Sequence, residues 1–265
     1  MVYTEKDLTF VICAYGESPY LEYCIRSLRR QSVKTKLVLA TSTPNLHIRS
    51  MAKLYGIPLH VNTGERGIAA DWNYALSVAE TELVMLAHQD DIYHRDYAAE
   101  ILIAANLSED PILFFTDYGE RRGDKTVIGN VLLRIKRLML LPLRVRAAWH
   151  SRFVRRRVLS FGSPICCPSV TYVRSKLPER LFDASYSVSL DWAAWEQLSR
   201  LDGSFVYVPK PLMLHRIHED SETTRQIGIS GRSTEDLAMY EKFWPKQIAR
   251  LLEHFYRSAE DSNRI

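Results

Sequence analysis

The residues most able to do chemistry in this chain are His88, Gln89, Asp90 and Asp91, which directly follow the apolar run 83–87. That run is short and apolar enough to be a strand buried on both faces. A parallel strand that ends in acids places them at the carboxyl edge of a sheet, where open α/β folds bind ligands. Adjacent carboxylates repel each other, and Mg²⁺ or Mn²⁺ suits oxygen ligands of this kind. The stretch therefore predicts either a metal site that could hold a diphosphate or a solvated turn after a strand.

Alternating strands and helices must position these acids. The segments 8–14, 36–40 and 59–62 have the composition of strands, whereas the segments from 20, 48–55 and 68–79 have helical spacing. Strands that alternate with helices indicate a doubly wound α/β fold, and right-handed crossovers would make its sheet parallel.

The later part of the chain continues this pattern with several further elements. A helix over 190–201 is predicted to begin after Ser187-Val188-Ser189, which places Asp191 in its first turn, where the helix dipole keeps a carboxylate ionised. An acid there is also an ordinary capping choice. The other predicted elements are a helix over 96–106, strands over 112–116, 169–173 and 205–208, an apolar strand over 212–214 that runs into polar groups, and one or two amphipathic helices over 233–257.

Length and composition set the class of protein. The chain of 265 residues is long enough for one large α/β domain, and its 46% apolar and 25% charged content is ordinary for a soluble globular protein. No run approaches the ~18 apolar residues of a membrane span, and the first residues lack the layout of a signal peptide. The cysteines show no C-x-x-C spacing, which favours a reducing, cytoplasmic location over a disulfide framework; they are Cys13, Cys24, Cys166 and Cys167.

Positive charge is concentrated between residues 121 and 157. The segment contains twelve Lys or Arg and one acid, Asp124, so its net charge is +11, whereas the net charge of the whole chain is +4. Its apolar residues recur on a roughly helical period that Pro142 interrupts. Such a helix either lies on an anionic membrane surface or packs on the domain with its arginines in water. Nucleic acid is not expected as a partner, because the segment has few aromatic residues and no recognisable binding module.

The order of the motifs resembles the family 2 inverting glycosyltransferases of the GT-A fold over almost the whole chain up to about Ser221. The matching stretches are Ala14-Tyr15-Gly16-Glu17 before a helix, Gly67 with Asn73, His88-Gln89-Asp90-Asp91 as an acidic D-x-D-D motif, Asp191 at a helix start, and His215-Arg216-Ile217-His218 with Ser221 as an R-x-H-x-x-S segment. Each stretch alone is a weak signal, but five in the right order are not.

This resemblance implies one GT-A domain over residues 1–265. We expect an α/β fold with a doubly wound, mostly parallel sheet flanked by helices, a basic helical insertion and C-terminal helices. Residues 1–119 would form the nucleotide-sugar-binding half, 120–221 the acceptor and catalytic half, and 222–265 the C-terminal helices. The implied reaction is metal-dependent, inverting transfer of a sugar from a nucleotide-diphosphate donor to a hydroxyl of a cell-surface glycan or lipid-linked precursor.

The resemblance also implies roles for individual residues. The base would be Asp191, with Glu196 one turn later as a rival. Mn²⁺ or Mg²⁺ would neutralise the leaving diphosphate. The implied metal ligands are Asp90, Asp91 and His218, and the implied donor-binding residues are Ala14, Tyr15, Glu17, Gly67, Asn73, Asp90 and Arg216. Tyr15 would stack on the nucleobase or be a core tyrosine, and His218 would be a ligand or a structural histidine.

Two positions depart from the family pattern. His88 replaces the first acid of the metal motif, which removes one charge and leaves the ligand set open. Thr41-Ser42-Thr43 stands where the family usually has an aspartate that contacts the nucleoside. The sequence therefore does not distinguish among UDP, dTDP and GDP as the nucleotide of the donor.

The sequence also allows other interpretations of the function and of the metal site. A sugar-phosphate nucleotidyltransferase would need a glycine-rich, basic phosphate loop, and residues 15–19 form a poor one. A degenerate homologue that binds membrane or glycan without turnover would explain His88. Zinc at His215, His218 and the cysteine pair matches no standard spacing. The expected location is cytoplasmic, with the possibility of peripheral attachment to the inner face of the cell membrane through 121–157.

Overall fold

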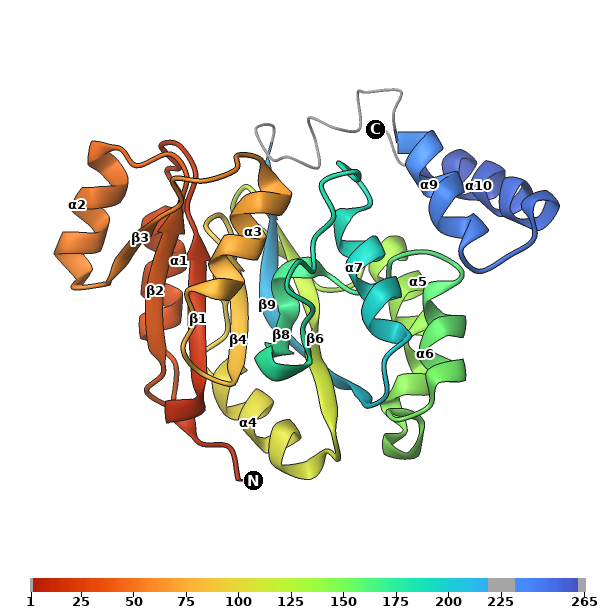
Figure 1. The fold of residues 1–265 in the computed structure, drawn as a ribbon, viewed down its shortest axis with the longest axis horizontal. Helices are drawn as coiled ribbons and strands as arrows, with labels where there is room; N and C mark the ends of the chain where they lie inside the picture. The colour runs from red at the N-terminus through yellow and green to blue at the C-terminus, as the bar shows by residue number, and fades with distance from the viewer. Residues whose placement is uncertain (1, 219–231, 262–265) are drawn as a thin grey trace.

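The computed structural model describes residues 2–218 and 232–261, and the strands within them form one nine-stranded sheet (Figure 1). The strands are β1 (Leu8–Cys13), β2 (Lys36–Thr41), β3 (Leu59–Val61), β4 (Leu83–His88), β5 (Ile92–Tyr93), β6 (Pro111–Arg122), β7 (Lys125–Val127), β8 (Val170–Val173) and β9 (Ser204–Ile217). Their order is β3-β2-β1-β4-β8-β6-β9-β5, and β7 pairs with β6 off this path. The α/β fold predicted from the sequence is confirmed.

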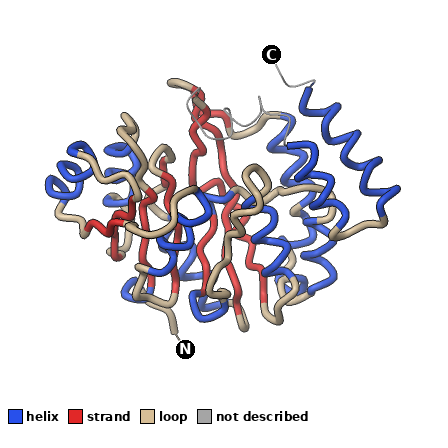
Figure 2. Tube along the Cα trace, turned by 45° about the horizontal axis from the view of Figure 1, so that its top comes forward, coloured by secondary structure: helices blue, strands red, loops and turns tan. Residues whose placement is uncertain are grey.

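Helices cover both faces of this sheet, with α1, α2 and α4 packed in one core and α3 and α7 in the other. Figure 2 shows the strands in the middle of the molecule with helices around them. The helices are α1 (Leu21–Arg29), α2 (Leu46–Tyr55), α3 (Ile68–Ser77), α4 (Tyr97–Leu107), α5 (Val131–Met139), α6 (Arg152–Leu159), α7 (Leu190–Ser199), α9 (Arg232–Glu241) and α10 (Lys246–Asp261). Among the described helices, none is both long and apolar enough to cross a membrane.

The first four strands of the sheet, β3-β2-β1-β4, are all parallel, as the alternation of strands and helices predicts. Successive residues of β1 point to opposite faces: Phe10 and Ile12 belong to the core that includes α1, α2 and α4, whereas Val11 belongs to the core that includes α3 and α7. Because both faces are covered, β1 is an uninterrupted apolar strand apart from the buried Thr9. The carboxyl ends of β1, β2 and β4 therefore meet at one edge.

The sheet is mostly parallel, as expected, and strand β8 is one of its antiparallel members, because it runs antiparallel to both β4 and β6. Met85 near the end of β4 pairs with Thr171 near the start of β8, and Leu83 pairs with Val173. The chain thus enters β8 from the carboxyl edge of β4 and can only run back across the sheet. This direction brings the preceding turn, which contains Cys166 and Cys167, to the same edge as Asp90 and Asp91.

Strand β9 corrects one expectation, since the segments 205–208 and 212–214 are one strand and not two. Val208 pairs with Thr116 and Pro211 with Asp117, so Pro209 and Lys210 form an irregularity inside a continuous ladder. The prolines suggested a break because they cannot donate to a ladder. Strand β6 is likewise longer than predicted, and the predicted boundary between residues 119 and 120 falls within it, so both halves share one sheet.

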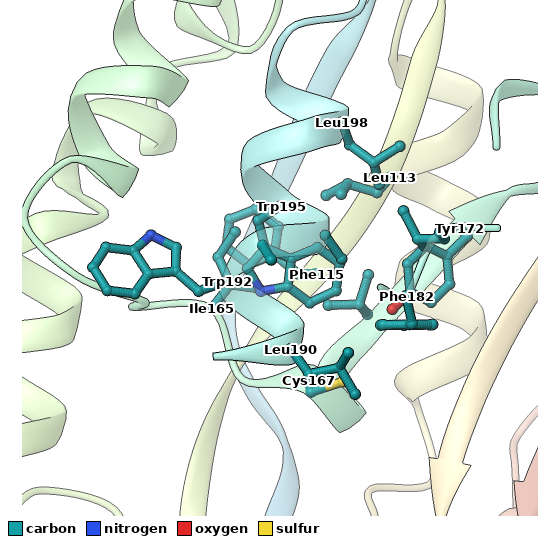
Figure 3. Close-up of a cluster of buried hydrophobic side chains, with 14 of the residues drawn as sticks. Leu113, Phe115, Ile165, Cys167, Tyr172, Phe182, Leu190, Trp192, Trp195 and Leu198 are labelled. Atoms are coloured by element: carbon teal, nitrogen blue, oxygen red, sulfur yellow. The ribbon is translucent and has the colours of Figure 1, made fainter. Parts of the chain in front are cut away.

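The core that includes α3 and α7 also fills the space between β6, β8 and α7 (Figure 3). The Trp195 ring is fully buried and stacks on Tyr172, with ring centroids 5.8 Å apart. On the neighbouring side of α7, Trp192 meets Tyr240 of α9 edge to face at 5.1 Å. This packing attaches the C-terminal helices, which the sequence predicts as an amphipathic pair, to the helix that carries Asp191.

The basic segment 121–157 is not the single interrupted helix that the sequence suggests. It contains the end of β6, the hairpin strand β7, helix α5, two short 3-10 turns and most of α6. Helix α5 begins at the N-cap Asn130, whose side chain accepts from the Leu133 N–H, and it ends before Pro142, which lies in the next turn. Arg155 is only 1% exposed and donates to the carbonyls of Ser199, Leu201 and Gly203 at the end of α7. Part of the charge is therefore structural.

Candidate functional site

The loop after β1 is fastened to the ends of two other strands. The Gln89 side chain accepts from the Tyr15 N–H at 3.0 Å and donates to the Tyr15 carbonyl at 2.9 Å. Thr43, after β2, accepts from the Gly16 N–H at 2.8 Å. Ala14 is buried and Glu17 is exposed, while the Tyr15 side chain is 63% exposed. Tyr15 is thus not a core tyrosine, and its ring is accessible to a nucleobase.

Asp90 connects this loop to Arg216 near the end of β9 and to His218, which directly follows β9. Its Oδ1 accepts from the Ser18 hydroxyl at 2.7 Å, and its Oδ2 lies 3.3 Å from His218 Nε2. Its backbone carbonyl accepts from Arg216 Nε at 2.8 Å. Four predicted site residues, Tyr15, Asp90, Arg216 and His218, are therefore brought to one edge.

Asp91 is 1% exposed and lies beneath that edge. Its Oδ1 accepts from the Arg216 N–H at 2.8 Å and lies 3.1 Å from His215 Nδ1. Burial alone would lower the pKa of His215, but the charge of Asp91 and the hydrogen bond to it outweigh burial and raise that pKa. Asp91, predicted as a metal ligand, thus fastens β9 to the end of β4 in this structure.

Aromatic rings hold the guanidinium and imidazole groups of this edge in place. The Arg216 guanidinium carbon lies 4.2 Å from the centroid of the Tyr20 ring, and the His218 ring lies 5.0 Å from the same ring. A cation over an aromatic face is attracted by the ring quadrupole. The sequence prediction missed Tyr20 and Ser18, although both follow the predicted loop 14–17 within three residues.

The donor atoms fit a divalent cation that is shared with a substrate. Asp90 Oδ2 and His218 Nε2, 3.3 Å apart, could both bind one ion, and Asp91 Oδ2 is a buried oxygen without a hydrogen-bond partner among the described residues. Within residues 2–218 and 232–261, no group of three or more His, Cys, Asp or Glu side chains forms a metal cage. Mg²⁺ typically takes one or two carboxylates and completes its shell with waters and substrate phosphates. The pair therefore suits a metal–diphosphate complex better than an isolated metal ion or zinc.

His88 adds no charge to this edge. Its ring lies 4.9 Å from the Trp72 ring at an interplanar angle of 30°. Burial lowers the pKa of His88, so the neutral imidazole is favoured near pH 7. The residue that replaces the first acid of the motif is therefore packed against an aromatic side chain of α3.

The two predicted donor residues at α3 have different surroundings. Gly67 is the N-cap of α3 with φ of 114°, a backbone conformation that favours glycine. Asn73 accepts from the N–H groups of Leu181 and Phe182 at 3.0 Å each and donates to the Phe182 carbonyl at 2.8 Å. The Asn73 amide thus holds the 181–182 loop and is not brought to Asp90.

A carboxylate does lie beside the residues that replace the family's nucleoside aspartate. Asp71 of α3 accepts from the Ser42 hydroxyl at 2.7 Å and from the Asn62 amide at 3.0 Å. It lies close enough to β1 for its charge to contribute to the raised pKa of Cys13, after burial. Its place early in α3 was visible in the sequence, but its approach to Ser42 depends on the packing of α3 over β2.

Asp191 lies in the first turn of α7 and is half-buried, with its Oδ1 accepting from the Trp192 N–H at 2.6 Å. Burial raises the pKa of the Cys166 thiol, the charge of Lys136 lowers it, and the charges of Asp91 and Asp191 raise it. The turn that enters β8 is thus within electrostatic range of both Asp91 and the predicted base.

Glu196, the rival base, is 2% exposed and fully engaged in ion pairs. Its Oε1 accepts from Arg156 at 2.7 Å and from Arg200 at 2.8 Å. It also lines a cavity of about 840 Å³ between α3, α7 and the 180–186 loop, whose lining includes Asn73 but not Tyr15, Asp90 or Asp191. Glu196 therefore joins α6 to α7 and does not face the edge.

The start of α7 is held by a carboxylate from the C-terminal helices. Glu235 of α9 accepts from the N–H groups of Ser187, Val188 and Ser189, each at 2.9 Å, and from the Ser187 hydroxyl at 2.7 Å. Asp236 accepts from the Ser189 hydroxyl at 3.0 Å. Burial alone would raise the pKa of Glu235, but these donors outweigh it and lower the pKa below its ordinary value of 4.5. Glu235 thus holds the residues that lead into α7, the helix that carries Asp191.

We expect Glu235→Gln to lower the free energy of unfolding at pH 7 by about 1 kcal/mol, because a neutral amide accepts weaker hydrogen bonds than a carboxylate does. A lowered carboxyl pKa means that the stabilisation is present above the unfolded pKa, ordinarily 4.5, and is lost as the pH falls through the folded pKa. Urea unfolding at pH 7 and at about pH 4 should therefore show a difference from wild type that shrinks with acidification. The exposed Glu241→Gln, on the same helix, is the control. An equal difference at both pH values would contradict the assignment.

The chain is similar to known proteins at the level of a family and of solved structures. The family described as Glycosyl transferase family 2 matches residues 9–182, which is more than half of the chain. No curated protein matches the chain significantly by sequence.

Solved structures share the fold at low sequence identity. Residues 1–349 of TarS from S. aureus, in complex with UDP-GlcNAc, align with a TM-score of 0.64 at 13% identity over 98% of this chain and 76% of that one. The mannosyltransferase PcManGT from Pyrobaculum calidifontis, with GDP-Man and Mn²⁺, gives 0.61 at 17% identity over 94% and 70%. Glucosyl-3-phosphoglycerate synthase from Mycobacterium tuberculosis, with Mn²⁺, UDP and its product, gives 0.56 at 12% identity over 90% and 80%. The chain spans 42% of the longer TarS structure.

Proposed function

Because the chain belongs to glycosyl transferase family 2, we propose that it transfers a sugar from a nucleotide-diphosphate donor to an acceptor hydroxyl, with a divalent metal and with inversion. The observation that carries the proposal is the convergence of Tyr15, Asp90, Arg216 and His218 at one edge of the sheet. A nucleotide at this edge would place its base on Tyr15 and its diphosphate near Asp90. The proposed reaction thus uses residues that follow β1 and β4 together with residues at the end of β9.

In this proposal the chain's own groups prepare the leaving diphosphate. Asp90 and His218 would hold Mn²⁺ or Mg²⁺, which when bound supplies positive charge to the departing phosphate oxygens. Arg216 is fixed by the Asp90 carbonyl and by the Tyr20 ring, so its guanidinium is preorganised before the donor binds. Asp91 would position Arg216 and would not touch the substrate.

Asp191 is the proposed general base. Its carboxylate would take the proton of the acceptor hydroxyl, whose oxygen forms a bond to the anomeric carbon on the face opposite the diphosphate. The bond from that carbon to the diphosphate oxygen breaks, and its electron pair leaves with the nucleotide. The products are an inverted glycoside and a nucleoside diphosphate. The hydrogen bonds from the start of α7 to Glu235 would keep the Asp191 carboxylate in place during this step.

Substrate identity is proposed only by class. The structural neighbours were solved with UDP-GlcNAc, GDP-Man or UDP, and two of them with Mn²⁺, which supports a nucleotide-sugar donor and a divalent metal. We propose a glycan or a lipid-linked precursor as the acceptor, with the enzyme at the inner face of the cell membrane. Gly67, Asn73, Ala14 and Glu17 stay predictions as donor-binding residues.

Calorimetric titration with UDP, dTDP, GDP and CMP, in Mn²⁺ and in chelator, tests this function. We expect one nucleotide to bind in Mn²⁺ and to lose at least tenfold in affinity with chelator. That nucleotide then decides which activated sugars to test for turnover. If none binds in either condition, the donor site is absent and the interpretation as a non-catalytic homologue replaces this one.

A further inference from the structure

Helix α5 turns its aliphatic side chains toward solvent. A surface helix of a globular protein normally buries its apolar stripe and exposes its charged face. In α5 only Leu133 is buried, whereas four other aliphatic side chains are widely exposed, namely Val131 at 70%, Leu132 at 45%, Ile135 at 49% and Leu138 at 65%. Their spacing of three and four residues places them along one side of the helix.

The inward side of the same helix carries charged groups. Lys136 donates to the Tyr118 hydroxyl at 3.0 Å, and Arg137 donates to Asp117 at 2.6 Å and to the Tyr118 carbonyl at 3.2 Å. Arg137 is 22% exposed and Asp117 9%. Because polar contacts with β6 fix these two cations on the inner side, the aliphatic side cannot turn inward without breaking them. The exposure of the aliphatic side is thus built into the fold.

The turns after α5 extend the same surface. Leu141 and Val145 are 45% and 60% exposed, and Arg134, Arg144 and Arg146 are exposed beside the aliphatic residues. Residues 131–146 contain five Lys or Arg and no Asp or Glu. We call this segment the docking surface. Its chemistry combines aliphatic side chains with a margin of positive charge.

We propose that the docking surface binds the face of an anionic phospholipid bilayer. The aliphatic side chains would enter the headgroup and acyl boundary while the arginines meet lipid phosphates and anionic headgroups. A second copy of this chain fits less well, because a two-fold contact would place the same arginines against each other. A surface that binds nucleic acid typically exposes aromatic rings on which bases stack, whereas the apolar residues exposed here are aliphatic. Charge and apolar area thus favour lipid.

The docking surface begins next to the candidate active site. The N-cap Asn130 donates to Glu120 at 3.0 Å, and Glu120 lies opposite His215 in the pairing of β6 with β9. His215 in turn contacts Asp91 beneath the donor edge. A bilayer on this surface would therefore bring a membrane-anchored acceptor toward the site, a consequence that rests on the proposed transfer reaction. The binding to lipid does not rest on it.

Vesicle sedimentation of the full chain without donor tests this inference. We expect at least tenfold tighter binding to vesicles with 30% phosphatidylglycerol than to pure phosphatidylcholine, and weaker binding at 0.5 M salt, since each basic residue near the surface contributes to attraction. Ile135→Asp/Leu138→Asp should lower the affinity for the anionic vesicles by at least tenfold, because two aliphatic side chains no longer enter the bilayer.

A matched control comes from the far side of the molecule. Leu46→Asp/Leu54→Asp changes two aliphatic residues of α2 that are 80% and 66% exposed, and it should bind vesicles as wild type does. Nucleotide binding by both double variants shows that they fold. The inference is overturned if wild type binds neither kind of vesicle, or if the α5 variant binds as tightly as wild type. It is also overturned if sedimentation shows a dimer that the α5 variant dissociates while lipid is not bound.

Discussion

Asp90→Asn is expected to lower kcat/KM by on the order of 10²- to 10³-fold, the range for removing one electrostatic group at a reacting centre. The amide keeps the shape and can still accept from Ser18, but it removes the charge that would hold the metal beside His218. The binding of nucleotide in Mn²⁺ should fall to the level seen with chelator. Steady-state kinetics and calorimetry of the variant check both parts.

Asp96→Asn is the matched control for this change. Asp96 lies six residues later, its side chain is 43% exposed, and its contacts are with His94 and Arg95 at the surface. We expect kinetics within twofold of wild type. Metal-dependent nucleotide binding that survives in Asp90→Asn would show that the ion is held elsewhere.

Asp191→Asn is expected to lower kcat by 10²- to 10⁴-fold, which is the usual contribution of a positioned general base. The affinity for nucleotide should change by less than about twofold, because Asp191 is proposed to act on the acceptor and not on the donor. Single-turnover rates with saturating donor, together with calorimetry, separate these two effects.

Asp202→Asn provides the comparison at the other end of α7, where the side chain is 90% exposed and pairs with Arg152. It should turn over like wild type. A variant at Asp191 that keeps more than a tenth of wild-type kcat would remove that residue from the role of base. An acid elsewhere at the edge would then have to take the proton.

The parts of the fold that depend on local patterns could be predicted from the sequence. The strand 83–87 ends at the acids because the sheet is covered on both faces up to its edge, and Gly56 ends α2 in the left-handed conformation, with φ of 56°. The family resemblance implies that the loop 14–17 and Asp90 both bind the donor, and the structure brings them to one edge because both follow parallel strands. Gln89 and Thr43 are the side chains that fasten that loop.

Contacts between distant segments could not be predicted from these patterns. The direction of β8 depends on the edge of the sheet at which the chain re-enters after the helical insertion. The contacts of Asp90 and Asp91 depend on which residues at the end of β9 lie next to them. Periodicity revealed that α5 is amphipathic, but the side that faces water is decided by Asp117 and Tyr118. Ser221, the last residue of the predicted closing motif, lies outside the described residues.

The hydrogen bonds between Glu235 and the residues that lead into α7 have a consequence for the biosynthesis of the protein. Glu235 is translated 44 residues after Asp191, so a nascent chain can complete β1, β2, β3 and β4 well before the Glu235 carboxylate exists. N-terminal parts generally fold first during synthesis. We therefore expect β1 to β4, with Tyr15 and Asp90, to form early, whereas Arg216, His218 and the proposed base would reach their final positions only once β9 and α9 have left the ribosome. Both donor binding and turnover would thus wait for the C-terminal part of the chain.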